Sequence, residues 1–165
     1  MLASGKKITD SRGERRKITM AMKLVQNSRG VAPRFAITVG LQEGYGPSAK
    51  IHSADEVISL VEAHLKECAS TGRPYLTGSV TAGTVVYAWL EGEGSAGGGH
   101  EPAACYSGEV NPRYNAGMTP KAVEEFLNGL AECLGVALGR PMVYVAFKGE
   151  IWILQREESA TPRLV

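Results

Sequence analysis

Two stretches of this sequence resemble each other at an offset of about 66 residues, the separation of Val57 and Val123. Each contains an apolar pattern with the period of a helix, and each pattern stops at the tripeptide Gly-Arg-Pro, at 72–74 and at 139–141. Glycine just past the last helical turn, with a proline shortly after it, is a typical helix terminator. A chain that repeats this boundary has to fit two similar units into one fold, which limits its architecture strongly.

The two predicted helices also have recognisable starts. Ser53 with Glu56 three residues later is a capping box, and Thr119 followed by Pro120 places a capping hydroxyl before a proline at the first helical position. The apolar stripes of these helices consist of Val57, Ile58, Leu60, Val61, Leu65 and Cys68 in the first, and of Val123, Phe126, Leu127, Leu130 and Leu134 in the second.

Short apolar runs surround both helices and predict strands. One run precedes each helix and two follow it: 35–42, 75–80 and 84–89 in the first stretch, and 102–108, 142–147 and 150–155 in the second. The sequence therefore predicts an α+β fold. We expect a duplicated β-α-β-β unit with a four-stranded core sheet, two helices on one face of that sheet and short extra strands.

Composition divides the chain into three parts. Residues 1–33 are a basic N-terminal arm that can form a hairpin, residues 34–156 are a single duplicated α+β domain, and residues 157–165 are a C-terminal tail. The first repeat is expected over about 35–90 and the second over about 102–155.

The basic arm suggests two kinds of contact. Residues 1–34 hold nine of the 18 Lys and Arg residues but only Asp10 and Glu14 among the 17 acidic residues. The rest of the chain is therefore acidic. Such an arm can bind nucleic acid, or it can fold back on its own acidic body, and the absence of interleaved aromatic residues favours the second.

Several residue patterns argue against particular classes of protein. The three cysteines have no CxxC spacing and the three histidines have no metal-ligand spacing, so no disulfide framework, metal site or cofactor is expected. No early apolar run is long enough for a signal peptide or a membrane span, and we expect a cytoplasmic protein that does not bind membranes.

Candidate binding residues lie in the two connections that lead into the helices. The connection at 111–115 contains Arg113 and Tyr114, and the earlier one contains Tyr45 and Lys50. A guanidinium beside aromatic rings suits a small, anionic or planar ligand, although the same residues also serve ordinary turns. His100 ends the glycine-rich segment 91–100, which is expected to be a flexible connector, and is the histidine to test as an acid or base.

One face of the predicted sheet is expected to lack a cover. Two helices cannot cover both faces, and the uncovered face should present Ala36, Thr38 and Gly40, with Thr77 and Ser79 from a neighbouring strand. We expect this surface to be closed by self-association, because a contiguous semi-apolar sheet face is uncommon on a monomer.

The repeated pattern resembles the tautomerase superfamily, which includes macrophage migration inhibitory factor. The resemblance covers roughly residues 33–154 as architecture, with local similarity at Pro33-Arg34-Phe35, at 101–105 and at 143–145. It implies a homotrimer whose sheets pack inward. The catalytic base of that family is an N-terminal proline, but Pro33 is an internal amide here, so the resemblance implies that the best-known activity is absent. Ferredoxin-like proteins are the alternative architecture.

Three functions follow from these observations. The first is a small self-associating protein that binds a small anionic molecule in a pocket between subunits, with Tyr45, Arg113, Tyr114 and His100 as candidate ligand-binding residues. The second is a tautomerase-like or isomerase-like enzyme that uses another base. The third is a nucleic-acid or protein-interaction module that uses the basic arm.

Overall fold

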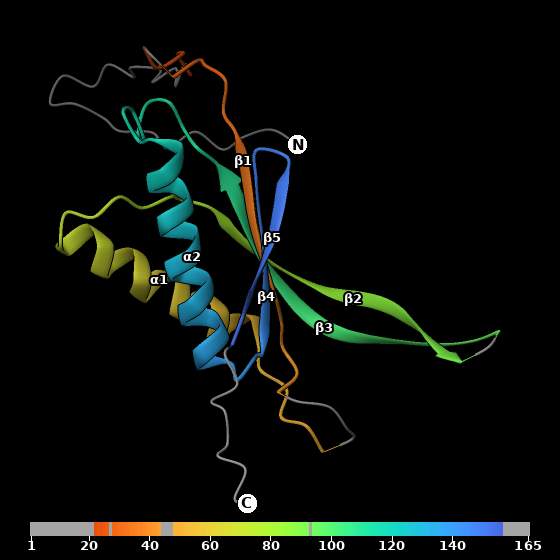
Figure 1. The fold of residues 1–165 in the computed structure, drawn as a ribbon. Helices are drawn as coiled ribbons and strands as arrows, with labels where there is room; N and C mark the ends of the chain where they lie inside the picture. Colours follow the sequence, from red (N-terminus) through yellow and green to blue (C-terminus); the bar gives the residue numbers. More distant parts are fainter. Residues whose placement is uncertain (1–21, 27, 44–47, 93, 157–165) are drawn as a thin grey trace, which may run out of the picture.

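The computed structural model describes residues 22–26, 28–43, 48–92 and 94–156. Its elements follow the chain as β1 (Arg34–Gly40), α1 (Ala54–Ser70), β2 (Ser79–Gly92), β3 (Ser95–Glu109), α2 (Pro120–Ala137), β4 (Met142–Phe147) and β5 (Glu150–Gln155). The strands form one five-stranded antiparallel sheet in the order β2-β3-β1-β4-β5. Both helices lie on the same side of this sheet (Figure 1), which confirms the predicted α+β class.

The core lies between the helices and one face of the sheet. Phe35, Ile37 and Val39 alternate inward from β1, as expected for a strand with one buried face. They meet the buried stripes of both helices. Ile58, expected in the stripe of α1, is instead exposed, because it lies at the margin of a stripe centred on Val57 and Val61.

The helix starts are formed as predicted. The Ser53 hydroxyl accepts from the Glu56 amide at 3.1 Å, and the Ser53 amide donates to the Glu56 carboxylate at 2.7 Å. That amide is the main reason why the pKa of Glu56 lies below its usual value. At the second helix the Thr119 hydroxyl accepts from the Ala122 amide at 3.2 Å.

The expected strand 84–89 is confirmed as part of β2, but its separation from 75–80 is wrong, because β2 is continuous from Ser79 to Gly92 and residues 75–78 precede it. Gly83 makes no turn and pairs with Ala103 on β3. The expected flexible connector at 91–100 is also wrong, since most of that segment belongs to β3 and the chain reverses between Gly92 and Ser95. The glycines suit this strand because a Cβ on Gly97 would come within 2.5 Å of the Trp89 ring.

The outer parts of β2 and β3 form a two-stranded projection, which we call the ribbon (residues 84–92 and 95–102). β1 ends at Gly40, opposite Ala103, and the Leu41 amide makes one more bond to the Pro102 carbonyl at 2.8 Å. Beyond that bond, in the described part of the chain, β3 pairs with β2 alone. Figure 1 shows the ribbon extending far from the sheet, on the side opposite the helices.

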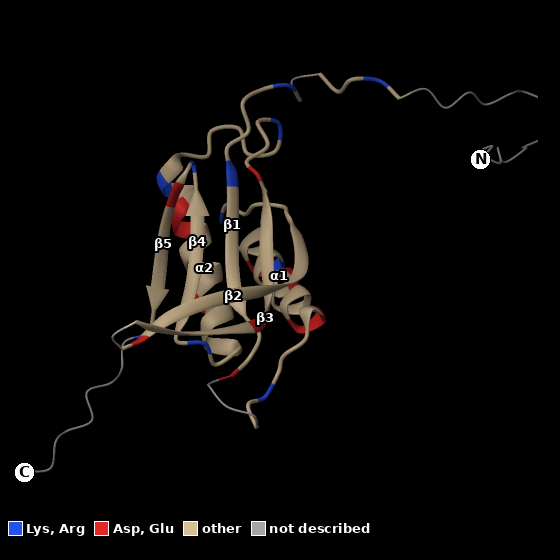
Figure 2. Cartoon of the chain, turned by 90° about the vertical axis from the view of Figure 1, so that its right-hand side faces the viewer, with Lys and Arg blue, Asp and Glu red and all other residues tan. Residues whose placement is uncertain are grey.

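No helix covers the sheet face that points away from α1 and α2 in the described part of the chain; in Figure 2 the outer parts of β2 and β3 cross in front of its lower part. Ala36, Thr38, Gly40 and Ser79 lie on it as expected, whereas Thr77 precedes β2. We call this surface the open face; strand alternation and register assign to it Ala36, Thr38, Gly40, Ser79, Thr81, Ala103, Cys105, Ser107, Tyr144, Ala146, Ile151 and Ile153.

Neither helix in the described part of the chain combines the length and apolarity that a membrane crossing needs. Most of the expected basic arm, with its hairpin, and the whole tail at 157–165 lie outside the described residues. The described residues 22–26 and 28–33 form no strand.

A buried ion pair fastens the base of the ribbon to the rest of the sheet. The Arg140 guanidinium, at the start of the connection to β4, donates to Glu101 on β3 at 2.8 Å and also to the Gln42 carbonyl after β1. Both side chains of the ion pair are largely buried. Arg73, at the equivalent place after α1, makes an exposed pair with Glu67. The two arginines that the sequence presents as equivalent therefore differ in burial.

Arg140→Met is expected to lower the free energy of unfolding by roughly 3 kcal/mol, because it leaves the buried Glu101 carboxylate without its partner. Arg73→Met is the matched control and is expected to cost about 0.5 kcal/mol or less, since exposed ion pairs contribute little. Urea denaturation of both variants checks this. Equal losses would show that the burial of Arg140 has no energetic consequence.

Candidate ligand pocket

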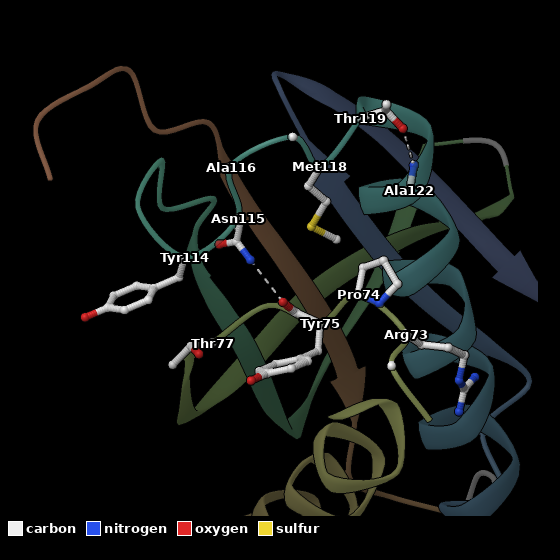
Figure 3. Close-up of a pocket in the computed structure, with 12 residues that line it drawn as sticks. Arg73, Pro74, Tyr75, Thr77, Tyr114, Asn115, Ala116, Met118, Thr119 and Ala122 are labelled. Atoms are coloured by element: carbon white, nitrogen blue, oxygen red, sulfur yellow. Dashed lines mark hydrogen bonds between the residues drawn. The ribbon is translucent and has the colours of Figure 1, made fainter. Parts of the chain in front are cut away.

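A pocket of about 770 Å³ lies between the segment that joins α1 to β2 and the segment that joins β3 to α2. Figure 3 shows its walls and the side chains that they carry. Its lining consists of Gly72, Arg73, Pro74, Tyr75, Thr77, Tyr114, Asn115, Ala116, Gly117, Met118, Thr119 and Ala122. The pocket is therefore built from two connections, one between α1 and β2 and one between β3 and α2, and not from a single loop.

Two tyrosine rings give the pocket most of its planar surface. Tyr75 and Tyr114 are 43% and 79% exposed, so both rings are available to a ligand. In Figure 3 Thr77 lies between the two rings, and the Tyr114 ring points away from the other lining residues. The Asn115 side-chain amide donates to the Tyr75 carbonyl at 3.1 Å, and this bond holds the two walls together.

The start of helix α2 forms a third side of the pocket through Thr119 and Ala122. A helix N-terminus carries a partial positive charge, which favours an anionic group nearby. Arg73, on the opposite wall, is engaged by Glu67 at 2.6 Å. The pocket thus combines aromatic surface with a weakly positive end.

Arg113 and Tyr114, which are consecutive in the sequence, lie at the edge of the pocket and in its lining, respectively. The Arg113 guanidinium lies 5.9 Å from the centre of the Tyr114 ring and donates to the Gln26 carbonyl at 2.9 Å. The Arg113 amide also donates to the Asn111 side chain at 2.9 Å, which is ordinary turn chemistry. Arg113 therefore shapes the loop and stands beside the pocket without forming part of its lining.

Of the other two candidate residues, His100 does not join this pocket, and Tyr45 lies outside the described residues. His100 lies in the ribbon, opposite Val86. The connection that contains Tyr45 leaves β1 after Gly40, next to Ala103, whereas the Arg113 connection leaves β3 at Glu109, next to Arg34. Antiparallel pairing thus puts the two connections at opposite ends of the sheet.

The lining residues Tyr75, Thr77 and Met118 were not anticipated from the sequence as a site, whereas Asn115 belongs to the connection 111–115 that was. Tyr75 and Thr77 were expected inside a strand, where alternate side chains would point to opposite faces. The available signal was Pro74, which delays the start of a strand because it has no amide hydrogen to donate to the sheet.

A separate hollow on the open face adjoins the pocket at Thr77. This hollow, of about 750 Å³, is lined by Ala36, Ser79, Ser107 and Ala146 of that face, among others. Thr77 lines both hollows. A molecule in the tyrosine pocket would therefore sit at the border of the surface that the helices leave uncovered.

Tyr106 holds the Tyr75–Thr77 wall in place from below. Its ring is buried against Phe35, and its hydroxyl donates to the carbonyl of Leu76, the residue between Tyr75 and Thr77. Burial raises the pKa of Tyr106 from its ordinary value of 10.0 to about 12. Among the described residues, no group of three or more His, Cys, Asp and Glu side chains is arranged to hold a metal ion.

No protein-family model and no curated protein matches this sequence. Among the solved structures that are similar in fold are two of a phage SAM lyase. One is a phage SAM lyase in complex with S-methyl-5'-thioadenosine, with 17% identity and a TM-score of 0.58, and the other is a phage SAM lyase in the apo state, with 16% identity and a TM-score of 0.59. Each comparison covers 82% of this chain and 98% of the other. At this level of identity the likeness shows a shared fold.

Tyr106→Phe is expected to cost about 1–2 kcal/mol of unfolding free energy at neutral pH, because it leaves the buried Leu76 carbonyl without a donor. The wild-type chain should also lose stability as the pH rises from about 10 through about 12, because the unfolded tyrosine ionises before the folded one. The variant should lack that part of the pH dependence. Urea denaturation across this range checks both effects, with the exposed Tyr144→Phe as control; identical pH profiles for Tyr106→Phe and the wild type would contradict the expectation.

Proposed function

We propose that this chain is a small self-associating protein that binds a small molecule with a planar ring and an anionic group, in the tyrosine pocket at the border between two copies. The observation that carries the proposal is a pocket with two accessible tyrosine rings that shares Thr77 with a hollow on the uncovered sheet face. The resemblance noted in the sequence implies a homotrimer as the assembly.

Self-association is supported by the character of the open face. Its centre consists of small residues such as Ala36, Thr38 and Cys105, and its margin carries the exposed side chains of Tyr144 and Ile153. Small side chains allow another sheet or strand to approach closely, and contiguous apolar surface favours association. A copy on this face would turn the pocket from an open hollow into a covered one.

The ligand class follows from the groups around the pocket. Phenol rings stack on planar rings, and Tyr75 and Tyr114 are both accessible for this. The N-terminus of α2 and the nearby Arg113 guanidinium favour a carboxylate or phosphate. S-adenosylmethionine has an adenine ring and a carboxylate, and it is the substrate class named for the structurally similar lyases. It is therefore our first candidate ligand, and its cleavage the first candidate activity.

We also propose that the fold consists of two duplicated halves. β1-α1-β2 and β3-α2-β4 are two β-α-β halves, and each helix connects strands that are separated in the sheet by one strand of the other half. Such interleaving is expected of two β-α-β units that share one sheet, as in ferredoxin-like proteins. β5 would then be the additional strand of the second half.

The double variant Tyr75→Ala/Tyr114→Ala is expected to weaken binding of S-adenosylmethionine by about 10-fold or more, since stacking on one aromatic ring contributes roughly 1–3 kcal/mol. Titration calorimetry with S-adenosylmethionine and with S-methyl-5'-thioadenosine measures this. Arg113→Met should weaken only the first ligand, because only that one carries a carboxylate.

Ile58→Ala, an exposed residue of α1, is the matched control and should leave binding unchanged. Incubation of the wild-type chain with S-adenosylmethionine, followed by chromatography for S-methyl-5'-thioadenosine, tests lyase activity separately. If the wild type and the tyrosine double variant bind S-adenosylmethionine with equal affinity, the tyrosine pocket is not the binding site.

A further inference from the structure

The ribbon displays apolar side chains on both of its faces. Val85, Tyr87 and Trp89 alternate on one face, and Val86 and Leu90 point to the other, where they are 78% and 86% exposed. A two-stranded ribbon is only marginally stable alone in water, and this one extends beyond the rest of the sheet. Apolar residues on both sides of such an element need a partner surface.

The aromatic face of the ribbon is preformed. Tyr87 lies over Gly99 and Trp89 over Gly97, where any Cβ would come within 3.0 Å or less of the ring. The two rings are 5.9 Å apart, and the Trp89 indole donates to the Glu91 carboxylate at 3.1 Å. The glycines thus let two aromatic rings, inclined by 32° to each other, lie across the ribbon. Because the rings are already ordered, this surface loses little conformational entropy on docking.

The charge of the ribbon limits the kind of partner. From Ser79 through Glu109 the sequence contains no Lys or Arg, whereas Glu91 and Glu101 add negative charge. Nucleic acid and anionic membrane surfaces would be repelled. A protein surface that is apolar and flanked by cations fits instead.

The opposite end of the same sheet provides such a surface. Ile151 and Ile153 are exposed on β5, with 75% exposure for Ile151, and Tyr144 lies beside them on β4. Lys148 lies just before β5 and Arg156 just after it, while β5 itself begins with Glu150. β5 also has an unpaired edge in the described part of the chain, as does the outer part of β3. Two free strand edges can pair with each other.

These two surfaces do not meet within one copy. β2 and β5 are the opposite edges of the sheet, and Leu90 and Ile151 each remain largely exposed. The aromatic face of the ribbon is, however, continuous with the open face, because Val85, Tyr87 and Trp89 keep the alternation of Thr81 on β2.

We propose that the ribbon is the docking arm of self-association and lies against the β4–β5 margin of the open face of a second copy. This inference rests on the self-association in the proposed function and names its contact. Since two different surfaces meet, the contact is head-to-tail and closes into a ring when the rotation between copies permits. The ribbon of one copy would then cover part of the open face of the next.

The test uses two variants of the full chain and measures molar mass by light scattering over a range of concentrations. Trp89→Ser/Leu90→Ser removes apolar contacts from the ribbon, and Ile151→Glu places a carboxylate on the receiving margin, against an acidic ribbon. Each is expected to weaken association on the order of tenfold or more. Val136→Ser, on the exposed side of α2, is the control and should associate as the wild type does. Circular dichroism verifies that every variant is folded.

Mixing the two variants distinguishes this contact from others. One variant has an intact receiving margin and the other an intact ribbon, so the mixture should recover a two-chain species that neither variant forms alone. No recovery would overturn the head-to-tail contact. If the Trp89→Ser/Leu90→Ser variant forms the same multimer as the wild type, the ribbon has no role in the contact, although the chain still self-associates.

A wild-type chain that stays at the mass of one copy would remove self-association itself, and the ribbon contact with it. If such a single copy bound phosphatidylcholine vesicles and the Trp89→Ser/Leu90→Ser variant did not, a lipid surface would be the occupant instead of a second copy. Binding of S-adenosylmethionine to the wild type is measured separately, so a failure of the ligand proposal is distinguishable from a failure of this one.

Discussion

The arrangement of this molecule depends on β3, which pairs along most of its length with β2 but over only part of it with the shorter β1. β3 runs for 15 residues, but its partner on one side, β1, has only seven. Where β1 is present, β3 is a central strand and its residues Ala104 and Tyr106 belong to the core. Beyond Gly40 the same strand continues without that neighbour and becomes half of the ribbon. One difference in strand length therefore produces both the packed domain and its projection.

The second constraint is that both helices cover the same face of the sheet. The covered face takes the large side chains, such as Phe35 and Ile37, and the open face takes small ones between them. The tyrosine pocket forms at one border of this arrangement, where the two connections leave the sheet, and Thr77 links it to the open face. The open face, the pocket and the ribbon are consequently adjacent parts of one surface, and the proposed ligand site and the proposed contact between copies both use it.

Two buried polar side chains, Arg140 and Tyr106, fix the base of the ribbon and the wall of the pocket. Arg140 connects Glu101 on β3 with the chain beyond β1, at the point where the ribbon departs. Tyr106 fastens Leu76, and with it the pocket wall, from inside the core. Each of these groups joins segments that are distant in the sequence. An unpaired buried charge or carbonyl is costly, so such bonds restrict the segments to few alternative positions.

The sequence by itself determined the elements that depend on local chemistry. Capping residues such as Ser53 and Thr119, the Gly-Arg-Pro terminators and the alternation after Phe35 act over a few positions, and for that reason the two helices, β1 and the α+β class were predictable. Tertiary structure alone decided the rest. Gly97 and Gly99 read as a flexible segment because their role depends on Trp89 and Tyr87 across the strand, and Arg140 differs from Arg73 only because Glu101 is brought beside it. The walls of the pocket come from connections about 40 residues apart, as the bond from Asn115 to Tyr75 shows, and strand register, which no local pattern records, brings them together.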